Sequence, residues 1–435
     1  MRWFEMSMKK FDVIVVGAGP AGITTAYELA KKGVEVLLIE RGEQVGVKNM
    51  FGGVVVGDWF RNLVPNIWEE GVIERPITQK KFSVLSNGLR VSAECENTDS
   101  DNPFGFTTYR PRFDNWYAGI AQKVGVTLLT ELSVEKLLVE NGRVVGVETD
   151  REDGEISADI VVLADGVNSI LHRSGTNGHK TDCSEYSLGV KEIIKVDGDI
   201  FRRLGINTER EGLSHEFIGL DGGVIGGGFL YTNSDTLSVG VVAKLRSLID
   251  NESNIYEVLD KFKNSRHIHH LISGGRSLEY SAHLIPTTYK KSTTLFSHGL
   301  IVAGDAAGFV LSTGLHFEGV NYAVASGVAA ASTVADCVNR RDFTCKTTSG
   351  YIRYLQQNHV LADMKGYRRA TTLIKSREFH RNVPGIICNS FNDMLRTPDN
   401  RPKEKFIYNA LKNIDKGNKM TRLREFYKII RAYVC

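Results

Sequence analysis

The sequence lacks a segment that is long and apolar enough to cross a membrane. Its longest uncharged apolar stretch, residues 319–335, is rich in Gly, Ala, Ser and Val, and it falls short of the about 20 strongly apolar residues that a spanning helix needs. The N-terminus carries Glu5, Lys9 and Lys10 and has no apolar stretch typical of a signal peptide. We therefore expect a cytoplasmic protein.

Cysteine is scarce and scattered. The six cysteines form no C-x-x-C pair, whereas zinc and iron–sulfur sites usually gather their thiols at short spacing. His267, His269 and His270 lie together without a neighbouring carboxylate or cysteine, so we interpret them as an exposed helix end rather than a zinc site. We expect no metal site in this chain and no disulfide framework.

The chain as a whole has little excess charge, with a formal net charge of +3. Residues 401–435 differ, because they carry 10 Lys and Arg against 3 Asp and Glu, which leaves 54 − 10 = 44 against 51 − 3 = 48 for the rest. Apolar residues interleave with these charges, as in amphipathic helices. This basic tail either packs onto the body or meets an anionic partner, such as a membrane surface or an acidic protein face. We expect no nucleic-acid partner.

A glycine-rich turn follows the first apolar run. Residues 11–16 predict a buried strand, residues 17–22 (Gly17-Ala18-Gly19-Pro20-Ala21-Gly22) interrupt it, and residues 23–32 predict a helix. The first glycine permits the tight turn, the second lets a pyrophosphate approach the backbone, and the third lets helix and strand pack closely. The pyrophosphate would lie on the positive end of the helix.

Three predicted strands end in an acid. Glu40 follows the strand of residues 34–39, and a carboxylate there accepts hydrogen bonds from ribose hydroxyls. Two later apolar strands end in Asp165-Gly166 and Gly304-Asp305. An acid at such a strand end can hold a cofactor hydroxyl, and the neighbouring glycine lets the ligand come close. Together with the glycine turn, these motifs predict a dinucleotide site.

The order of these motifs resembles that of the flavin monooxygenase-type, or glutathione reductase-like, FAD proteins. Finer motifs are similar to the FixC/EtfC proteins, which are flavoprotein–quinone oxidoreductase subunits of electron-bifurcating complexes. These motifs lie in residues 46–53, 227–233, 279–286, 313–322 and 391–396. The chain departs from larger single-chain quinone oxidoreductases because it lacks their C-terminal cysteine-rich iron–sulfur domain. Val47 also stands where relatives often have Cys.

The resemblance implies an α/β FAD fold of two domains with an α+β insert and a C-terminal helical segment. We expect a discontinuous FAD-binding domain in residues 1–76, 105–185 and 290–360. Residues 77–104 and 186–289 would form a β-rich quinone or substrate domain, and residues 361–435 a basic helical segment.

The resemblance also implies FAD as cofactor, bound by residues from each FAD-binding piece. Arg112 matches a family arginine near the flavin, Lys48 is a candidate cation beside the ring, and residues 314–316 would open the long helix with their N–H groups aimed at the flavin. The expected cofactor-binding residues are Gly17, Gly19, Pro20, Ala21, Gly22, Glu40, Arg41, Lys48, Asn49, Gly52, Gly53, Arg112, Val134, Asp165, Gly166, Gly304, Asp305, Gly314 and Leu315.

No nucleophile–base pair is recognisable, so catalysis would belong to the cofactor. A quinone ring needs flat apolar walls and one or two hydroxyl donors. Phe229, Tyr231, Tyr280 and Pro286 are candidates for this wall, and ordinary core packing is the alternative interpretation.

The resemblance implies an electron-transfer subunit that passes electrons from a two-subunit electron-transfer flavoprotein to a quinone. It would act in an NADH-dependent bifurcating complex with a small ferredoxin-like iron–sulfur subunit, at the inner face of the cell membrane. A geranylgeranyl reductase that saturates isoprenoid double bonds, an aromatic hydroxylase and a non-catalytic flavin-bearing assembly subunit are the alternatives.

Overall fold

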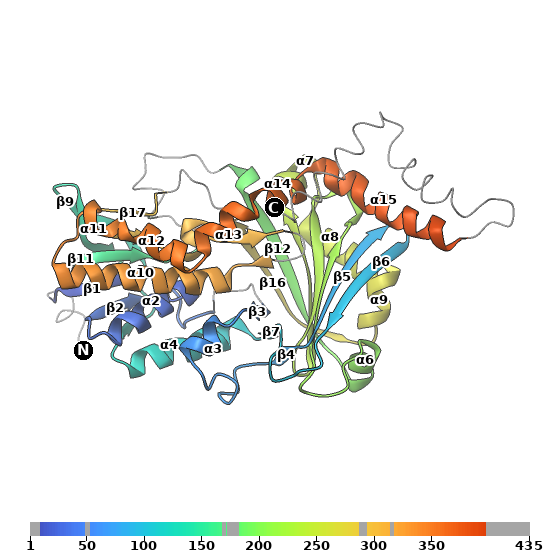
Figure 1. Ribbon diagram of the computed structural model, residues 1–435, viewed down its shortest axis with the longest axis horizontal. Helices are drawn as coiled ribbons and strands as arrows, with labels where there is room; N and C mark the ends of the chain where they lie inside the picture. Colours follow the sequence, from blue (N-terminus) through green and yellow to red (C-terminus); the bar gives the residue numbers. More distant parts are fainter. Residues whose placement is uncertain are drawn as a thin grey trace.

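The protein is built around two large β-sheets, each covered by helices, as the computed structural model shows (Figure 1). The structure describes residues 9–47, 53–167, 171, 182–286, 294–313 and 317–396. Within these residues, the first sheet and its helices occupy one half of the molecule and the second sheet the other half. A row of C-terminal helices runs along both halves.

The first sheet has a parallel centre. Its strands run in the order β17-β18-β11-β1-β2-β8, and β10 and β9 join it by antiparallel pairing beside β11. The central strands are continuous runs of Val, Ile and Leu that are buried on both faces, as expected for parallel strands. The bounds are β1 Phe11–Val16, β2 Val36–Ile39, β8 Thr127–Leu129, β9 Val134–Glu140, β10 Arg143–Thr149, β11 Glu155–Leu163, β17 Phe296–Ser297 and β18 Leu300–Val302.

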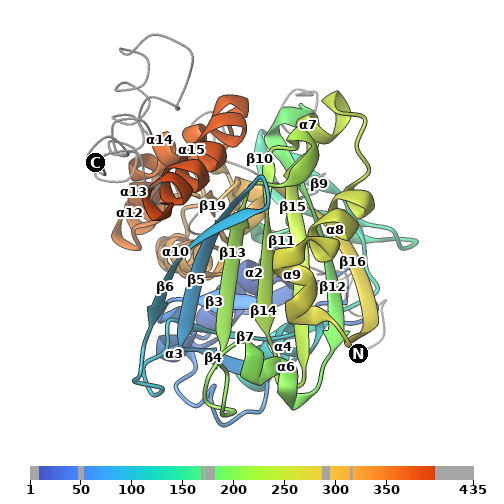
Figure 2. The same cartoon turned by 90° about the vertical axis from the view of Figure 1, so that its right-hand side faces the viewer.

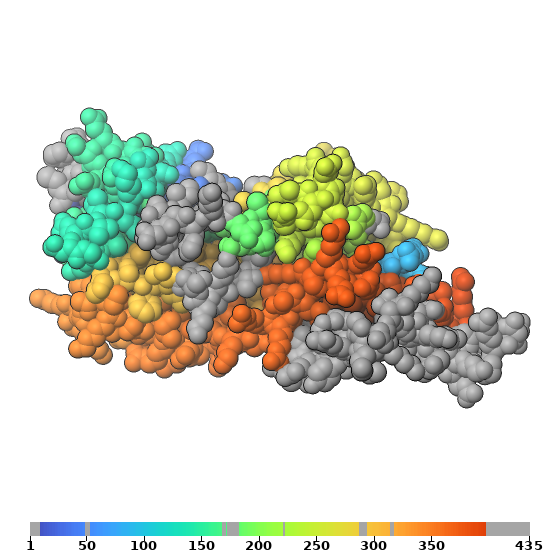
Figure 3. Space-filling view, turned by 90° about the horizontal axis from the view of Figure 1, so that it is seen from above, coloured from blue at the N-terminus to red at the C-terminus, as the bar shows by residue number. Residues whose placement is uncertain are grey.

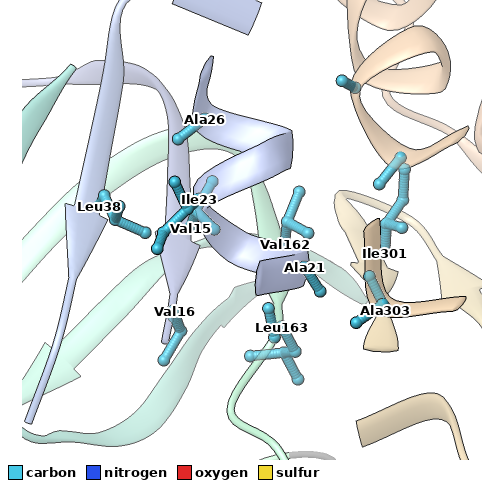
Figure 4. Packing of buried hydrophobic residues seen from close by; sticks show 14 of the residues in the cluster. Val15, Val16, Ala21, Ile23, Ala26, Leu38, Val162, Leu163, Ile301 and Ala303 are labelled. Atoms are coloured by element: carbon cyan, nitrogen blue, oxygen red, sulfur yellow. The ribbon is translucent and has the colours of Figure 1, made fainter. Parts of the chain in front are cut away.

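Helix α2 (Pro20–Ala30) follows β1 directly and packs against α4 (Arg110–Lys123) and α10 (Val320–Arg340). A Cβ at Gly327 of α10 would lie 2.6 Å from the carbonyl oxygen of Ala21, so this close helix contact depends on glycine. Figure 4 shows the apolar side chains of α2, β1, β2, β11 and β18 packed together. This core holds the carboxyl ends of the parallel strands beside the start of α2.

The hairpin predicted at Asn141 and Gly142 is confirmed, since β9 and β10 pair antiparallel on either side of them. Asn141 has φ 49° and Gly142 has φ 77°. Two consecutive residues with positive φ are typical of a type I′ turn, which matches the twist of the strands.

The second sheet has the order β16-β12-β15-β14-β13-β5-β6, and only β13 and β5 pair in parallel. Helices α8 and α9 cover one of its faces (Figure 2) over a core that includes Phe217, Leu230 and Phe262. The bounds are β5 Gln79–Ser86, β6 Leu89–Glu96, β12 Tyr186–Lys195, β13 Leu213–Ile218, β14 Gly226–Thr232, β15 Thr236–Lys244, β16 Arg276–Pro286, α6 Gly198–Arg203, α7 Leu245–Asp250, α8 Ile255–Asn264, α9 Arg266–Ile272, η1 Cys183–Glu185 and η2 Asp221–Gly223.

A small antiparallel sheet joins the two halves. It consists of β3 (Val54–Val56), β7 (Gly105–Thr107) and β4 (Arg75–Ile77), and α3 (Trp59–Leu63) lies between β3 and β4 in the chain. The buried Arg75 guanidinium donates hydrogen bonds to carbonyl groups of the second half, 2.7 Å to Asn233 and 3.0 Å to Ser234. A buried cation that is satisfied in this way holds the junction in one arrangement.

The C-terminal helices lie along one side of the molecule and span both halves (Figure 3). The last of them, α15, packs on β5 and β6 of the second sheet. The Cys388 thiol on α15 donates to the carbonyl of Val84 at 3.4 Å. The bounds are α11 Cys345–Thr348, α12 Gly350–Gln357, α13 Val360–Gly366, α14 Arg368–Ile374 and α15 Arg377–Leu395.

No helix among the described residues has both the length and the apolar character that crossing a membrane requires. The basic tail of residues 401–435 lies outside the described residues. The two sheets divide the chain near residues 77, 105, 186 and 290, and we propose domain boundaries at these points.

Candidate functional site

The glycine turn between β1 and α2 is closed on one side and open on the other. Gly17 has φ 99°, and a Cβ there would lie 2.4 Å from the carbonyl oxygen of Ala164. A Cβ at Gly22 would lie 1.9 Å from the carbonyl oxygen of Gly17, whereas a Cβ at Gly19 would meet nothing within 4 Å. Gly17 and Gly22 therefore make the turn tight, and the space beside Gly19, at the start of α2, is left for a ligand.

Glu40 stands at the end of β2, beside this turn. Its two carboxylate oxygens accept hydrogen bonds from the backbone N–H of Ala18 at 3.1 Å and of Gly42 at 2.7 Å. These charge-assisted bonds fix both neighbouring loops. Because a carboxylate has about four acceptor positions, Glu40 can still accept from a ligand hydroxyl.

The other two strand ends lie at the same edge of the sheet, since β11 pairs with both β1 and β18. Gly166 has φ 72°, and a Cβ there would meet nothing within 4 Å. Asp305 lies in the short helix η3 (Gly304–Ala307) directly after β18. Burial raises the pKa of Asp305 to about 6, and the positive charge of Arg110 opposes this shift.

These strand ends surround a cavity of about 270 Å³, which we call the cofactor cavity. Most of the predicted cofactor residues that the structure describes line it, whereas Gly22 and Gly304 pack behind the wall. Lys48, Asn49, Gly52, Gly314 and Leu315 lie outside the described residues. The predicted residues in the wall are Gly17, Gly19, Pro20, Ala21, Glu40, Arg41, Gly53, Val134, Asp165, Gly166 and Asp305.

Arg112 does not line the cofactor cavity, so the structure corrects that expectation. Its side chain is 53% exposed and donates to Glu74 at 2.9 Å. Arg110 lines the cavity instead and makes a bidentate pair with Asp114, with both distances 2.8 Å. The two arginines are two positions apart on α4, where successive side chains turn by about 100°, and therefore face nearly opposite directions.

The long helix begins later than the sequence indicates. Residues 314–316 lie outside the described residues, but β20 (Phe317–Glu318) pairs with β19 (Leu311–Ser312) before α10 begins at Val320. Strand β20 therefore lies in the chain before α10, so the long helix begins at Val320 and not at the predicted residues 314–316.

Two further cavity residues stand in motifs quoted above but were not predicted as site residues. Asn321 donates to Glu318 at 2.6 Å, and its Oδ1 atom is buried without a hydrogen-bond partner within the described part of the chain. A buried carbonyl oxygen of this kind is a candidate acceptor for a ligand N–H group. His283 also lines the wall, and burial, followed by Arg110 and Arg41, lowers its pKa.

A second cavity of about 110 Å³ adjoins the first, and we call it the inner cavity. Tyr231 and Phe317 line both cavities. The rings of Tyr231 and Phe229 stack with centroids 4.8 Å apart and an angle of 16°. A Cβ at Gly240 would lie 2.3 Å from the Phe229 ring, so only glycine lets that ring lie flat on β15. Two of the predicted quinone residues therefore form one aromatic wall.

The structure separates Tyr280 and Pro286 from this wall. Tyr280 is 47% exposed, and its hydroxyl accepts a hydrogen bond from Lys263 on α8 at 2.9 Å. In β16 the three consecutive residues His283, Leu284 and Ile285 line the cofactor cavity. Tyr280 and Pro286 lie on either side of this stretch, and neither lines the cofactor cavity or the inner cavity.

The histidines of α9 lie at the outer surface of the second sheet. His267 contacts the carbonyl of Gly88 at 2.9 Å, and His270 contacts that of Arg266 at 3.0 Å. Over the described ranges, no group of three or more His, Cys, Asp or Glu side chains is arranged to hold a metal ion.

Two family profiles match the chain, "FAD dependent oxidoreductase" over residues 12–183 and "ETF-QO, ubiquinone-binding" over residues 186–285. The chain is 36% identical to the probable electron transfer flavoprotein-quinone oxidoreductase YdiS of Escherichia coli strain K12, over 94% of this chain and 96% of that protein. It is also 36% identical to Protein FixC of Azotobacter vinelandii, over 92% and 94% of the two chains. The chain belongs to the FixC family.

Solved structures confirm the predicted class of fold for this FixC family member. A geranylgeranyl bacteriochlorophyll reductase-like protein from Thermoplasma acidophilum has a TM-score of 0.74 at 18% identity and covers 97% of this chain and 100% of that one. The FAD-dependent halogenase CndH has a TM-score of 0.62 at 18% identity, with 98% and 91% covered. At this identity the likeness concerns the fold alone.

This FixC family member is an FAD-dependent oxidoreductase. The cofactor cavity fits FAD in three respects that the structure itself provides. The open side of Gly19 at the start of α2 suits a pyrophosphate, Glu40 suits a ribose, and the buried Oδ1 of Asn321 suits a ring N–H group. Bound FAD supplies the redox chemistry, and the chain binds and orients it.

Proposed function

We propose that this FixC family member takes electrons from an electron-transfer flavoprotein and passes them to a quinone. The proposal rests on the aromatic wall that the two cavities share. Tyr231 lines the cofactor cavity on one side and the inner cavity on the other. An acceptor in the inner cavity would therefore lie one aromatic layer from the flavin.

The chemistry of the inner cavity supports a quinone as that acceptor. Its wall is mainly apolar and aromatic, and it lies largely in the residues that match the ubiquinone-binding profile. Flat apolar walls with a few polar groups are what a quinone ring requires. The named relative YdiS, a probable electron transfer flavoprotein-quinone oxidoreductase, points to the same pair of substrates.

We also propose the finer assignment that the family resemblance implies. The chain would work in an NADH-dependent electron-bifurcating complex with a two-subunit electron-transfer flavoprotein and a small ferredoxin-like iron–sulfur subunit, at the inner face of the cell membrane. Purification of the native complex tests this assignment. Co-purification of those subunits and NADH-dependent reduction of both a ferredoxin and a quinone would support it, and their absence would contradict it.

Stopped-flow spectroscopy tests the electron path itself. The FAD-loaded protein is mixed with a reduced electron-transfer flavoprotein, and the flavin absorbance is followed before and after decylubiquinone is added. We expect reduction of the flavin followed by reoxidation on addition of quinone. Failure of the first step would indicate an assembly subunit, and hydrogenation of a prenyl lipid by the reduced protein would indicate a reductase of isoprenoid double bonds.

A further inference from the structure

The inner cavity contains ionisable side chains on two different walls. Glu216 lies on β13 in the sheet wall, and Lys375 and His380 come from the junction between α14 and α15. The remaining lining is mainly apolar or glycine. An apolar cavity that keeps an acid and a base in its wall is unusual, because desolvation of a charged group is costly.

Glu216 is held in place by its neighbours in the sheet. Its carboxylate accepts a hydrogen bond from the hydroxyl of Ser214 at 2.6 Å. On the two flanking strands it stands opposite Phe82 and Phe229, which carry aromatic rings. Burial raises the pKa of Glu216, and the hydrogen bond from Ser214 and the charge of Lys80 oppose the shift without cancelling it. The carboxyl group therefore keeps its proton to a higher pH than an exposed glutamate does.

Lys375 lies on the helical wall. Burial lowers the pKa of Lys375 to about 7, and the charge of Lys244, which also lines the cavity, adds to the shift. An amine with this pKa is about half protonated near neutral pH and can give up a proton, which an ordinary lysine cannot do readily.

The His380 ring is held close to Lys375. Its Nε2–H donates a hydrogen bond of 2.7 Å to the carbonyl of Ile374, the residue that precedes Lys375. The other ring nitrogen, Nδ1, is buried without a hydrogen-bond partner among the described residues. Burial lowers the pKa of His380, so the ring is neutral at neutral pH and Nδ1 carries a lone pair. His380 can therefore accept a hydrogen bond from a ligand hydroxyl but does not supply a proton.

We propose that Glu216 and Lys375 donate the two protons that convert a quinone in the inner cavity to the quinol. This inference rests on the proposed function. Each carbonyl oxygen of the quinone gains one O–H bond, as the Glu216 carboxyl loses one proton and the Lys375 ammonium loses the other. The two electrons come through the cofactor, and solvent restores both protons. The quinol hydroxyl formed beside the helical wall then has Nδ1 of His380 as acceptor.

The two donors predict how quinone reduction depends on pH. Because the ammonium form of Lys375 is the donor, the rate should fall as the pH rises through about 7. The charge of Lys244 acts on Lys375 and the charge of Lys80 acts on Glu216, whereas burial lowers the pKa of His380 and keeps its ring neutral. The alkaline fall in rate should therefore follow Lys375.

The experiment compares quinone reduction with reduction of ferricyanide, which takes an electron without a proton. Lys375→Met and Glu216→Gln should each lower decylubiquinone reduction by about 100-fold and leave ferricyanide reduction unchanged. Lys375→Arg keeps the charge, but a guanidinium does not release its proton in this range. This variant should therefore reduce decylubiquinone as slowly as Lys375→Met does. Lys365→Met, on the exposed surface of α13, is the matched control and should retain both activities.

A measurement on the wild-type protein does not depend on activity or on the folding of variants. Acetylation of Lys375 over a range of pH, followed by mass spectrometry, should reach half of its maximal rate near pH 7 and should slow in the presence of decylubiquinone. Wild-type rates in quinone reduction by the Lys375→Met and Glu216→Gln proteins would overturn the proton-donor proposal alone. Wild-type protein that transfers electrons to ferricyanide but not to any quinone would overturn the proposed function as well.

Discussion

The two adjoining cavities are built in different ways. The cofactor cavity takes its shape largely from backbone, since Gly17 closes its turn, Gly19 and Gly166 leave open sides, and Glu40 is fixed by two backbone N–H groups. The inner cavity takes its shape from side chains that three distant parts of the chain supply, the second sheet, the β19–β20 hairpin and the α14–α15 junction. Backbone turns of this kind leave a local sequence signature, whereas side chains from distant segments do not.

The two cavities should therefore differ in the substitutions that they tolerate. The closed side of the backbone cradle is sensitive to the addition of a single methyl group, because carbonyl oxygens lie within 2.4 Å of the positions where a Cβ of Gly17 or Gly22 would stand. A wall of side chains can change one member and keep its shape. The following predictions test this contrast.

The largest effect is expected from Gly22→Ala. The added Cβ would lie 1.9 Å from the carbonyl oxygen of Gly17, so β1 and α2 must separate. We expect a loss of about 3 kcal/mol or more in the free energy of unfolding and purification without FAD. Thermal or denaturant unfolding and the flavin absorbance measure the two results.

Gly19→Ala is the matched comparison for that variant. The Cβ would meet nothing within 4 Å, and the backbone at φ −83° and ψ 179° suits alanine. The free energy of unfolding of the protein without FAD should remain within about 0.5 kcal/mol of wild type, while FAD affinity falls because the methyl group enters the space for the pyrophosphate. Equal losses of stability in the two variants would contradict the contrast between the closed and open sides of the turn.

The sequence was sufficient to predict the parts of the site that depend on neighbouring residues. The glycine turn, the three strand-end acids and the 141–142 hairpin each lie within a few residues, and the structure places them as the local pattern indicates. Arg112 illustrates the limit of prediction from local sequence. To tell that Arg110 and not Arg112 faces the cofactor cavity, one must know how α4 is rotated about its own axis.

The remaining errors have related causes. To place Tyr280, one must know which part of β16 reaches the cofactor cavity. To place the start of α10, one must know of a hairpin whose strands have only two residues. Lys375 and Glu216 meet around one cavity although they are far apart in the chain. Nothing in the local pattern around either residue indicates that both line the same cavity.

Tyr231→Ala tests the wall that the cavities share. Removal of the ring should lower quinone reduction by about 30-fold, equivalent to about 2 kcal/mol, because the stack with Phe229 is lost. FAD content should stay intact, since the backbone cradle does not include this side chain. Tyr256→Ala, on an exposed tyrosine of α8, should change neither quantity. Quinone kinetics equal to those of wild type would reject the role of Tyr231.

The smallest effect concerns Asp305. The stability of the folded protein should depend on pH with one sign for this acid in the cofactor cavity and with the opposite sign for an acid at the surface. Burial raises the pKa of Asp305 from 3.8 to about 6, so ionisation destabilises the folded protein without FAD as the pH rises from 4 to above 6. Asp305→Asn should therefore be more stable than wild type at pH 8, and the advantage should disappear near pH 4.

Asp342 gives the opposite dependence. Hydrogen bonds from Thr347 and Thr344 lower the pKa of Asp342 to about 2, so its ionised form stabilises the folded protein at pH values above 4. Asp342→Asn should be less stable than wild type at neutral pH, and the difference should vanish as the pH falls toward 2. Denaturant unfolding from pH 2 to 8 measures both variants. The same sign for the two would contradict the view that Asp305 is held for a ligand at a cost to the empty fold.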